Sequence, residues 1–458
     1  MRLTKNIPFI PLVLLSACSN EPVDIGDDPD PDPDGQYSLV LDLLPEEVVD
    51  VDLLFVMDNS GSMAEEQASI AAWAEESLFG VLELEPGTPL NLHIGIVSSD
   101  VGAGPYNISG CSGTGDDGGM QNAPRAAGCE PPTDAYIVDL DDGAGGRITN
   151  YAGTLDETFS CIAQLGIDGC GFEHPLESMR RAFDNPANAG FLRDDALLAV
   201  VIVSDEDDCS ASDTSMFDTS ETSIDDPLGP LSSFRCFEFG VVCDGDEPRA
   251  AGDKIKCAPR DASTYITEVS DYADYLKSLK DDPSMVVVAG IIGKPDRYRA
   301  TVSTDVNGNP MLDPVCESAG GSAAPGIRLQ AFFDSFPDRN RVASICSDDM
   351  SGPLEEAAMR IIDVARRAPC LRGDLVDKDL ERIGLQPRCR TYEQTTLDGG
   401  MVQRTEIRPC SDGIAGPCFE VNEDLSACGH TQSALAVSIS RSDAPPAGSH
   451  TVVECVTP

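Results

Sequence analysis

The sequence has few basic residues, few histidines and no hydrophobic run long enough to cross a membrane. Its 458 residues include 31 Lys and Arg against 79 Asp and Glu, which gives a formal net charge of −48. This balance argues against a nucleic-acid partner, because such binding needs clustered cations. The acidic excess favours solubility outside the cell, or carboxylate clusters that need divalent cations, and the two interpretations are compatible.

The sequence also lacks the patterns of common metal and hydrolase sites. The cysteines form no close Cys-x-x-Cys pair of the kind typical of zinc sites. Neither a Gly-x-Ser-x-Gly elbow nor a His-Glu-x-x-His helix is present. The four histidines are scattered through the chain, at His93, His174, His430 and His450. We therefore expect that the protein is not an enzyme.

The first residues carry the features of a secretion signal. Arg2 and Lys5 give a positive start, and the apolar stretch 7–15 that follows is shorter than the ~20 residues of a spanning helix. Leu15-Ser16-Ala17-Cys18 resembles the lipobox of bacterial lipoproteins. The resemblance implies a signal peptide over residues 1–17 and lipidation of Cys18. An ordinary signal peptide that happens to contain Cys18 is the alternative.

Removing Cys18 from the 17 cysteines leaves 16, and an even number in an exported chain indicates disulfides. Local pairing predicts Cys111–Cys129, Cys161–Cys170 and Cys316–Cys346, with Cys209, Cys236, Cys243 and Cys257 pairing among themselves. The remaining six candidates are Cys370, Cys389, Cys410, Cys418, Cys428 and Cys455. Connectivity is not fixed by sequence alone.

The chain is expected to contain a linker and two folded parts. Residues 18–37 include alternating Asp and Pro, which resist helix formation and repel one another, so they are predicted to form an extended spacer. Residues 38–369 are predicted to form the main domain. Residues 370–458, with six cysteines and short β-like runs at 401–407, 435–439 and 451–456, are predicted to form a small β-rich module.

The main domain alternates strand-like and helix-like segments. Mostly apolar runs typical of strands buried on both faces lie at 51–57, 90–97, 197–203 and 285–292. Apolar residues at helical spacing lie between them, at 64–82, 175–183, 262–279 and 354–365. This alternation predicts an α/β fold with a doubly wound, mostly parallel sheet. Two stretches rich in Gly, Asp, Ser, Pro and Cys, near 99–160 and 208–260, are predicted to be disulfide-rich insertions.

The chemically informative residues follow the first of these strands. Asp58, Ser60 and Ser62 alternate on a loop at the carboxyl end of the strand, where open α/β sheets place their ligands. One carboxylate and two hydroxyls suit a hard, oxygen-preferring cation. Ser62 followed by Glu65 also fits a helix capping box, which is the competing interpretation.

Residues 51–62 closely resemble the first strand and the metal-ion-dependent adhesion site (MIDAS) of von Willebrand factor type A (VWA) domains, and the resemblance extends over about 48–368. It implies an Asp after a later central strand, which Asp205 supplies. The family often has Gly after this Asp, whereas this chain continues with Glu206, Asp207 and Asp208. These extra acids are taken to be solvated surface, with a second ion as the alternative.

The resemblance also implies a Thr before a helix, and this chain has none there. Glu173 falls nearest that position, in Cys170-Gly171-Phe172-Glu173-His174-Pro175. Glu173 is therefore a candidate ligand, either direct or through water. Its alternative role is a carboxylate at the amino end of the following helix. A charged ligand in place of Thr would weaken the ion's attraction for an acidic partner.

The lipobox-like segment implies a lipid-anchored envelope protein, and the VWA resemblance implies that it binds Mg²⁺, or Ca²⁺ or Mn²⁺, at Asp58, Ser60, Ser62, Asp205 and Glu173. A protein partner would complete the metal shell with an acidic residue, so adhesion or assembly is the expected function. The alternative is a structural envelope lipoprotein whose ion only stabilises the fold. Ser19 after Cys18 favours the outer membrane, on the periplasmic or the outer side.

Overall fold

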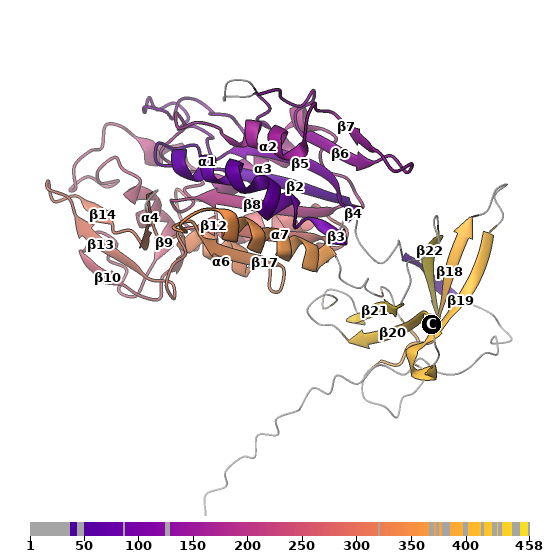
Figure 1. Ribbon diagram of the computed structural model, residues 1–458. Helices are drawn as coiled ribbons and strands as arrows, with labels where there is room; N and C mark the ends of the chain where they lie inside the picture. The colour runs from indigo at the N-terminus through magenta and orange to yellow at the C-terminus, as the bar shows by residue number, and fades with distance from the viewer. Residues whose placement is uncertain are drawn as a thin grey trace, which may run out of the picture. The chain divides into compact units, whose positions relative to one another are not determined.

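The structure is a computed structural model. It describes residues 37–43, 50–85, 88–123, 129–318 and 321–365, and in the C-terminal region residues 371, 375–377, 385–396, 402–413, 416–423, 428, 433–441 and 449–456. The chain divides into two compact units, Glu46–Arg367 and a second unit that combines Met1–Pro45 with Ala368–Pro458 (Figure 1). Each unit is described by itself.

The larger unit is built on a seven-stranded sheet in the order β17-β12-β8-β2-β5-β6-β7. The five strands from β17 to β5 pair in parallel, and β6 and β7 continue the sheet antiparallel. The prediction of a mixed α/β fold with a mostly parallel sheet is confirmed. The strands are β2 (Asp50–Met57), β5 (Asn91–Ser98), β6 (Ile137–Asp141), β7 (Arg147–Thr149), β8 (Leu197–Ser204), β12 (Val286–Ile292) and β17 (Asn340–Ser344).

Helices cover both faces of this sheet, which explains why the central strands are mostly apolar. In β2, Leu53 and Phe55 face a core formed with α1, α2 and α7, whereas Leu54 and Val56 face a core formed with α3, α5 and α6. The two cores therefore lie on opposite sides of one sheet (Figure 1). The helices are α1 (Ala64–Trp73), α2 (Leu155–Ala163), α3 (Pro175–Asp184), α5 (Val269–Ser278), α6 (Ile327–Asp334) and α7 (Ser351–Ala365).

Helix boundaries agree with the sequence pattern except in one case. The pattern over 64–82 becomes α1 followed by a π-helical segment, Ala74–Phe79. The helix expected over 262–279 begins only at Val269, and Ala262 has a positive φ of 51° that an α-helix does not accept. No helix among the described residues is long and apolar enough to span a bilayer.

The disulfides support the predicted covalent frame, but two of the proposed pairs are wrong. Cys111 pairs with Cys170, and Cys129 pairs with Cys161. The chain therefore crosses between the insertion near 99–160 and the segment before α3, instead of closing two short loops. The pairs predicted within the second insertion and at Cys316–Cys346 are found, as Cys209–Cys236, Cys243–Cys257 and Cys316–Cys346.

Both insertions contain helices or strands. The first contains β6 and β7, and its end leads into α2. The second contains α4 (Phe234–Gly240) and two short paired strands, and it supplies β10 to a three-stranded sheet with β13 and β14. The strands of these small sheets are β9 (Val241–Val242), β11 (Ala258–Pro259), β10 (Gly252–Lys254), β13 (Ala300–Thr304) and β14 (Pro310–Leu312). Further two-stranded pairs are β3 (Glu83–Glu85) with β4 (Thr88–Pro89) and β15 (Cys316–Glu317) with β16 (Ser322–Ala323).

The second unit is a six-stranded sheet in the order β1-β22-β18-β19-β20-β21. Its first strand, β1, was assigned by sequence to the main domain, but it pairs antiparallel with β22. The disulfides Cys389–Cys455 and Cys410–Cys418 lie in this unit, and Cys428 is also disulfide-bonded. Cys370 and Cys18 lie outside the described residues. The strands are β1 (Tyr37–Leu43), β18 (Cys389–Thr396), β19 (Val402–Pro409), β20 (Cys418–Glu423), β21 (Leu435–Ser440) and β22 (Ser449–Val456).

Candidate functional site

The chain reverses its direction of sheet growth at β2. From β2 it adds β5, β6 and β7 on one side, and it then returns to add β8, β12 and β17 on the other side. Open α/β sheets bind ligands at such a switch point, beyond the carboxyl ends of the strands. The carboxyl ends of β2 and β8 lie side by side here, because Met57 pairs with Val203.

Asp58 is the first residue after β2, and its side chain is fully buried. Its backbone N–H donates to the Val203 carbonyl at 2.9 Å, which joins the loop to β8. Its Oδ1 accepts from the Ser60 N–H at 2.8 Å, and its Oδ2 accepts from the Ser204 hydroxyl at 2.7 Å. The carboxylate is therefore fixed by two donors, one from its own loop and one from the end of β8.

Ser60 and Ser62, on the loop that follows Asp58, lie next to one another. Their hydroxyl oxygens are 3.3 Å apart. The capping interpretation of Ser62 is wrong, because the residue that caps α1 is Met63 and it makes no side-chain cap hydrogen bond. The Ser62 hydroxyl instead hydrogen-bonds Asp205, where it lowers the pKa that burial raises.

Asp205 follows β8 directly, with a relative exposure of 6%. Its backbone carbonyl accepts from the Ala324 N–H at 2.8 Å, so the loop is held from behind. Its Oδ1 is buried and has no hydrogen-bond partner. The structure thus brings Asp58, Ser60, Ser62 and Asp205 to one loop cluster at the ends of β2 and β8.

Glu173 comes from a third segment and joins the same cluster. The Cys209 N–H donates to its carbonyl at 2.7 Å, which places Glu173 beside the loop after β8. The side chain is only 1% exposed, and neither carboxyl oxygen has a partner at hydrogen-bond geometry. Burial, then the neighbouring charges of Glu206 and Asp58, raise the pKa of Glu173 well above its usual value.

Glu173 does not hydrogen-bond the amino end of α3, and its alternative role there stays a prediction. Two other residues accept from the free N–H groups of this helix. Asp208 Oδ1 accepts from the Leu176 N–H at 3.1 Å, and the Ser210 hydroxyl accepts from the Glu177 N–H at 2.9 Å. The carboxylate of Glu173 is thus not needed by the helix.

Asp207 and Asp208, which were expected to be solvated, have structural roles. Asp207 accepts from the N–H groups of Arg328 and Leu329 and so caps α6. Asp208 is fully buried and forms an ion pair with the equally buried Arg328, at 2.9 Å. Burial raises the pKa of Asp207 to about 6 against the effect of these donors.

Carboxyl groups without counterions define the electrostatics of the cluster. Burial, then the charge of Asp205, raise the pKa of Asp58 to about 7. Burial also raises the pKa of Glu206 to about 7. The hydrogen-bond contact with the Glu173 carboxyl is the largest of the effects that lower this pKa. Within the described residues, no Lys or Arg forms an ion pair with these groups. On α1, Glu66 adds a further buried carboxyl, whose pKa rises through burial and the charge of Asp205.

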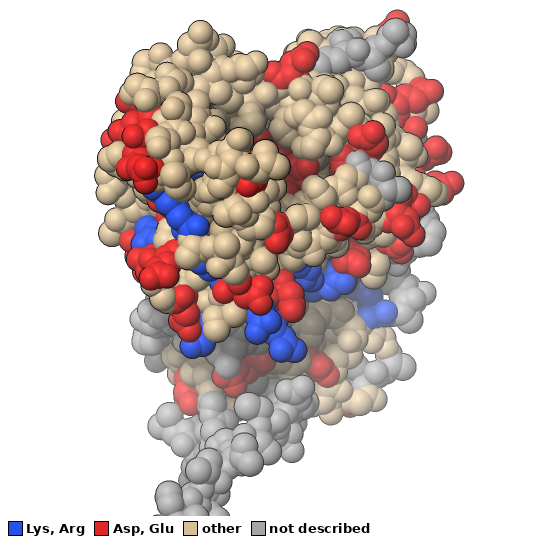
Figure 2. All heavy atoms as spheres, turned by 90° about the vertical axis from the view of Figure 1, so that its left-hand side faces the viewer, with Lys and Arg blue, Asp and Glu red and all other residues tan. Residues whose placement is uncertain are grey.

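Polar atoms without partners concentrate at this edge of the sheet. Native proteins pair nearly all buried polar groups, so each exception calls for an explanation. The buried, unpartnered atoms here belong to Asn59, Glu66, Ser99, Glu173, His174 and Asp205. Figure 2 views the side of the molecule onto which this edge opens, where Asp and Glu side chains gather, including inside a hollow.

The oxygen atoms of the loop cluster suit a hard divalent cation, but the cluster offers it few carboxylates. No group of three or more His, Cys, Asp and Glu side chains in the described parts of the chain is arranged to hold a metal ion. The set Asp58, Ser60, Ser62 and Asp205 has only two such carboxylates, with two hydroxyls as the other oxygens. The unpartnered Asp205 Oδ1 and the buried Asp58 are the kind of donors that Mg²⁺ accepts.

No protein-family model and no curated protein sequence matches the chain. Among solved structures, it is similar to the pilus adhesin SpaC from Lactobacillus rhamnosus GG, with 10% identity, a TM-score of 0.31 and 89% of this chain covered. It is similar also to the human COPII-coat protein Sec24c, with 7% identity, a TM-score of 0.28 and 89% coverage. The chain spans 39% and 44% of their lengths, and likeness at this level carries no argument.

Proposed function

We propose that Glu46–Arg367 is a VWA-type domain that binds a divalent cation and, through it, a protein partner. The observation that carries the proposal is the juxtaposition of Asp58, Ser60, Ser62 and Asp205 at the switch point of a doubly wound sheet, with a buried carboxylate oxygen left unpartnered. The resemblance of residues 51–62 to the metal-ion-dependent adhesion site supports the same conclusion.

Each of these residues has a role in the proposal. Asp58 and Asp205 provide the negative charge, and Ser60 and Ser62 provide neutral oxygens. Mg²⁺ is the preferred ion, with Ca²⁺ or Mn²⁺ as alternatives, and when bound it supplies a positive centre for an incoming ligand. The partner is a protein that offers an acidic side chain, and the activity is adhesion or assembly without catalysis.

The proposed setting is the bacterial cell envelope, with Cys18 lipidated and anchored in the outer membrane. The lipobox-like Leu15-Ser16-Ala17-Cys18 supports it. A structural role for the ion is the second candidate. In this second candidate, the buried carboxylate of Glu173 completes the shell of the ion in place of a side chain from a partner.

Titration of Mg²⁺ by calorimetry into wild type, Asp58→Asn and Ser62→Ala tests the cation site. Asp58→Asn removes a charge, so we expect at least a tenfold loss of affinity, and Ser62→Ala removes a dipole that water replaces, so the loss is smaller. Exposed Asp225→Asn is the matched control. Unchanged affinity in Asp58→Asn overturns the site. Partner capture that survives chelation, with the fold intact, overturns the adhesion role and leaves the structural one.

A further inference from the structure

The proposed cation site uses Asp58, Ser60, Ser62 and Asp205. It gives no role to two other acidic residues of the cluster, Glu173 and Glu206. Glu173 is buried, its carboxyl group lies beside that of Glu206, and neither of its oxygens accepts a hydrogen bond from an N–H or hydroxyl group. Glu206, immediately after Asp205, is half-buried beside it. Two carboxyl groups buried side by side with no cationic group between them are costly, and a bound cation would compensate for this cost.

Backbone hydrogen bonds hold the segments that carry Glu173 and Glu206 next to one another. The Cys209 N–H bonds to the Glu173 carbonyl at 2.7 Å, and this bond spans the loop that contains Glu206. The Ser204 hydroxyl accepts from the Glu206 N–H at 3.2 Å while donating to Asp58 Oδ2 at 2.7 Å. Glu206 is therefore fixed relative to both Glu173 and Asp58.

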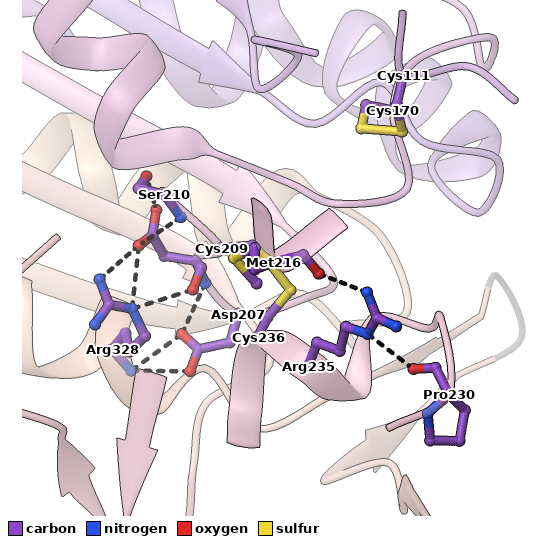
Figure 3. Close-up of a disulfide and its surroundings, with 11 residues drawn as sticks. Cys111, Cys170, Asp207, Cys209, Ser210, Met216, Pro230, Arg235, Cys236 and Arg328 are labelled. Atoms are coloured by element: carbon purple, nitrogen blue, oxygen red, sulfur yellow. Dashed lines mark hydrogen bonds and ion pairs between the residues drawn. A yellow bond between two sulfur atoms is a disulfide. The ribbon is translucent and has the colours of Figure 1, made fainter. Parts of the chain in front are cut away.

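An uncharged oxygen ligand, a serine hydroxyl, lies next to the Glu206 carboxyl. The Ser233 hydroxyl, at the start of α4, hydrogen-bonds the Glu206 carboxyl. The Cys209–Cys236 disulfide joins α4 to the loop after β8 and so holds Ser233 close to it (Figure 3). Two carboxylates and a hydroxyl, from three separate segments, thus converge.

Charge balance points the same way. Asp58, Asp205, Glu173 and Glu206 carry four negative charges when ionised, and one divalent cation leaves a net charge of about −2, which repels an acidic ligand. A second divalent cation brings these four groups to neutrality. Glu66 adds a fifth carboxyl near Asp205, which makes the excess of negative charge with one ion larger still.

We propose that Glu173 and Glu206, with the Ser233 hydroxyl, hold a second divalent cation distinct from the one at Asp58 and Asp205. Ca²⁺ suits this position, because it accepts bidentate carboxylates, irregular geometry and several waters. The second site stands on its own observations. Its consequence, that the second ion makes an acidic partner acceptable, rests on the proposed function.

The test is a count of bound Ca²⁺ on the full chain after chelation, by equilibrium dialysis and calorimetry in about 0.15 M salt, which screens weak surface binding. We expect two ions on wild type, one on Glu206→Gln and one on Asp58→Asn. Exposed Glu317→Gln is the matched control and keeps two. Near-ultraviolet circular dichroism reports whether each variant keeps its tertiary structure.

The outcomes separate the two proposals. A single ion on wild type that is lost in Asp58→Asn and kept in Glu206→Gln overturns the second site and leaves the proposed function standing. A single ion that is lost in Glu206→Gln and kept in Asp58→Asn supports the Glu173–Glu206 site and overturns the first. The wild-type count needs no variant, so the proposal stays falsifiable even where a substitution unfolds the chain.

Discussion

Asp208 and Arg328 form an ion pair in which both side chains are almost completely buried. Arg328 also donates to the carbonyls of Asp208, Gly240 and Thr267, so its guanidinium joins the loop after β8 to α4 and to the segment before α5. Breaking a buried pair by removing one partner leaves the other charge uncompensated, which costs about 3–5 kcal/mol.

Arg328→Met should therefore lower the free energy of unfolding by about 3–5 kcal/mol, measured by urea denaturation. The matched control is Arg341→Met, which removes an exposed ion pair with Glu356 at 2.8 Å. Exposed pairs contribute about 1 kcal/mol or less. Equal losses in the two variants would contradict the role assigned to the buried pair.

The raised pKa of Asp58 predicts a pH dependence for the chelated protein. Asp58 titrates near 4 in the unfolded chain and at about 7 in the folded one, so between these values the folded state holds the extra proton. Folding stability then falls as pH rises from about 4 to 7, by about 1.4 kcal/mol per pH unit for one fully buried group.

Thermal unfolding of the chelated protein at pH 5 and pH 7 measures this effect, and saturating Mg²⁺ should remove most of the difference. Asp58→Asn, which cannot ionise, is the control and should show a flatter profile. A chelated wild type that gains stability between pH 5 and 7 contradicts the assignment.

The sequence could identify part of the cluster because its ligands lie close together along the chain. Asp58, Ser60 and Ser62 share one loop, and Asp205 directly follows an apolar strand. The roles of Asp207 and Asp208 could not be predicted from the sequence. Their partner Arg328 lies 120 residues beyond Asp208, and the residues around Arg328 in the sequence do not indicate that it is buried. The only available signal for Glu206 was its place next to Asp205.

Among the elements, the loop after β8 is held from both of its ends. β8 precedes it, and the Cys209–Cys236 disulfide joins its end to α4. This disulfide therefore limits the positions that Asp205 and Glu206 take. Cys243–Cys257, in the same insertion, joins β9 to the start of β11 and does not include this loop.

Replacing Cys209 and Cys236 by Ala should cost about 3 kcal/mol of stability, since the bridge closes a loop with a sequence separation of 27. It should also weaken Mg²⁺ binding severalfold, because the loop loses its fixed end. The Cys243/Cys257 double Ala variant is the control and should keep its cation affinity. Calorimetry and thermal unfolding measure both effects, and equal affinities in the two variants contradict the inference.

Strands buried on both faces were predictable, whereas edge strands were not. The runs at 51–57, 90–97, 197–203 and 285–292 are mostly apolar, so they stand out from the loops. β17, in contrast, is Asn340–Ser344 with only a partly buried pattern, and β7 is three residues long. The pairing of β1 with β22 joins segments about 400 residues apart, and no local pattern reports such a contact.

At the scale of the whole molecule, the attachment to the membrane is predicted to depend on one residue. Under the proposed lipidation of Cys18, Cys18→Ser should release the chain from membranes, because lipidation requires the thiol. Membrane fractionation in high salt measures this release, with the wild-type chain as the control. A variant that still sediments with membranes contradicts the anchor.

The position of β2 has a mechanical consequence. The chain enters the larger unit at the amino end of β2, and Asp58 lies at its carboxyl end. A partner that pulled at Asp58 against an anchor upstream of β1 would thus load this strand along its axis. β5 and β8 flank β2 in parallel register over eight and seven residue pairs. Their hydrogen bonds would be sheared together instead of opening one by one, the arrangement in which a sheet best resists tension.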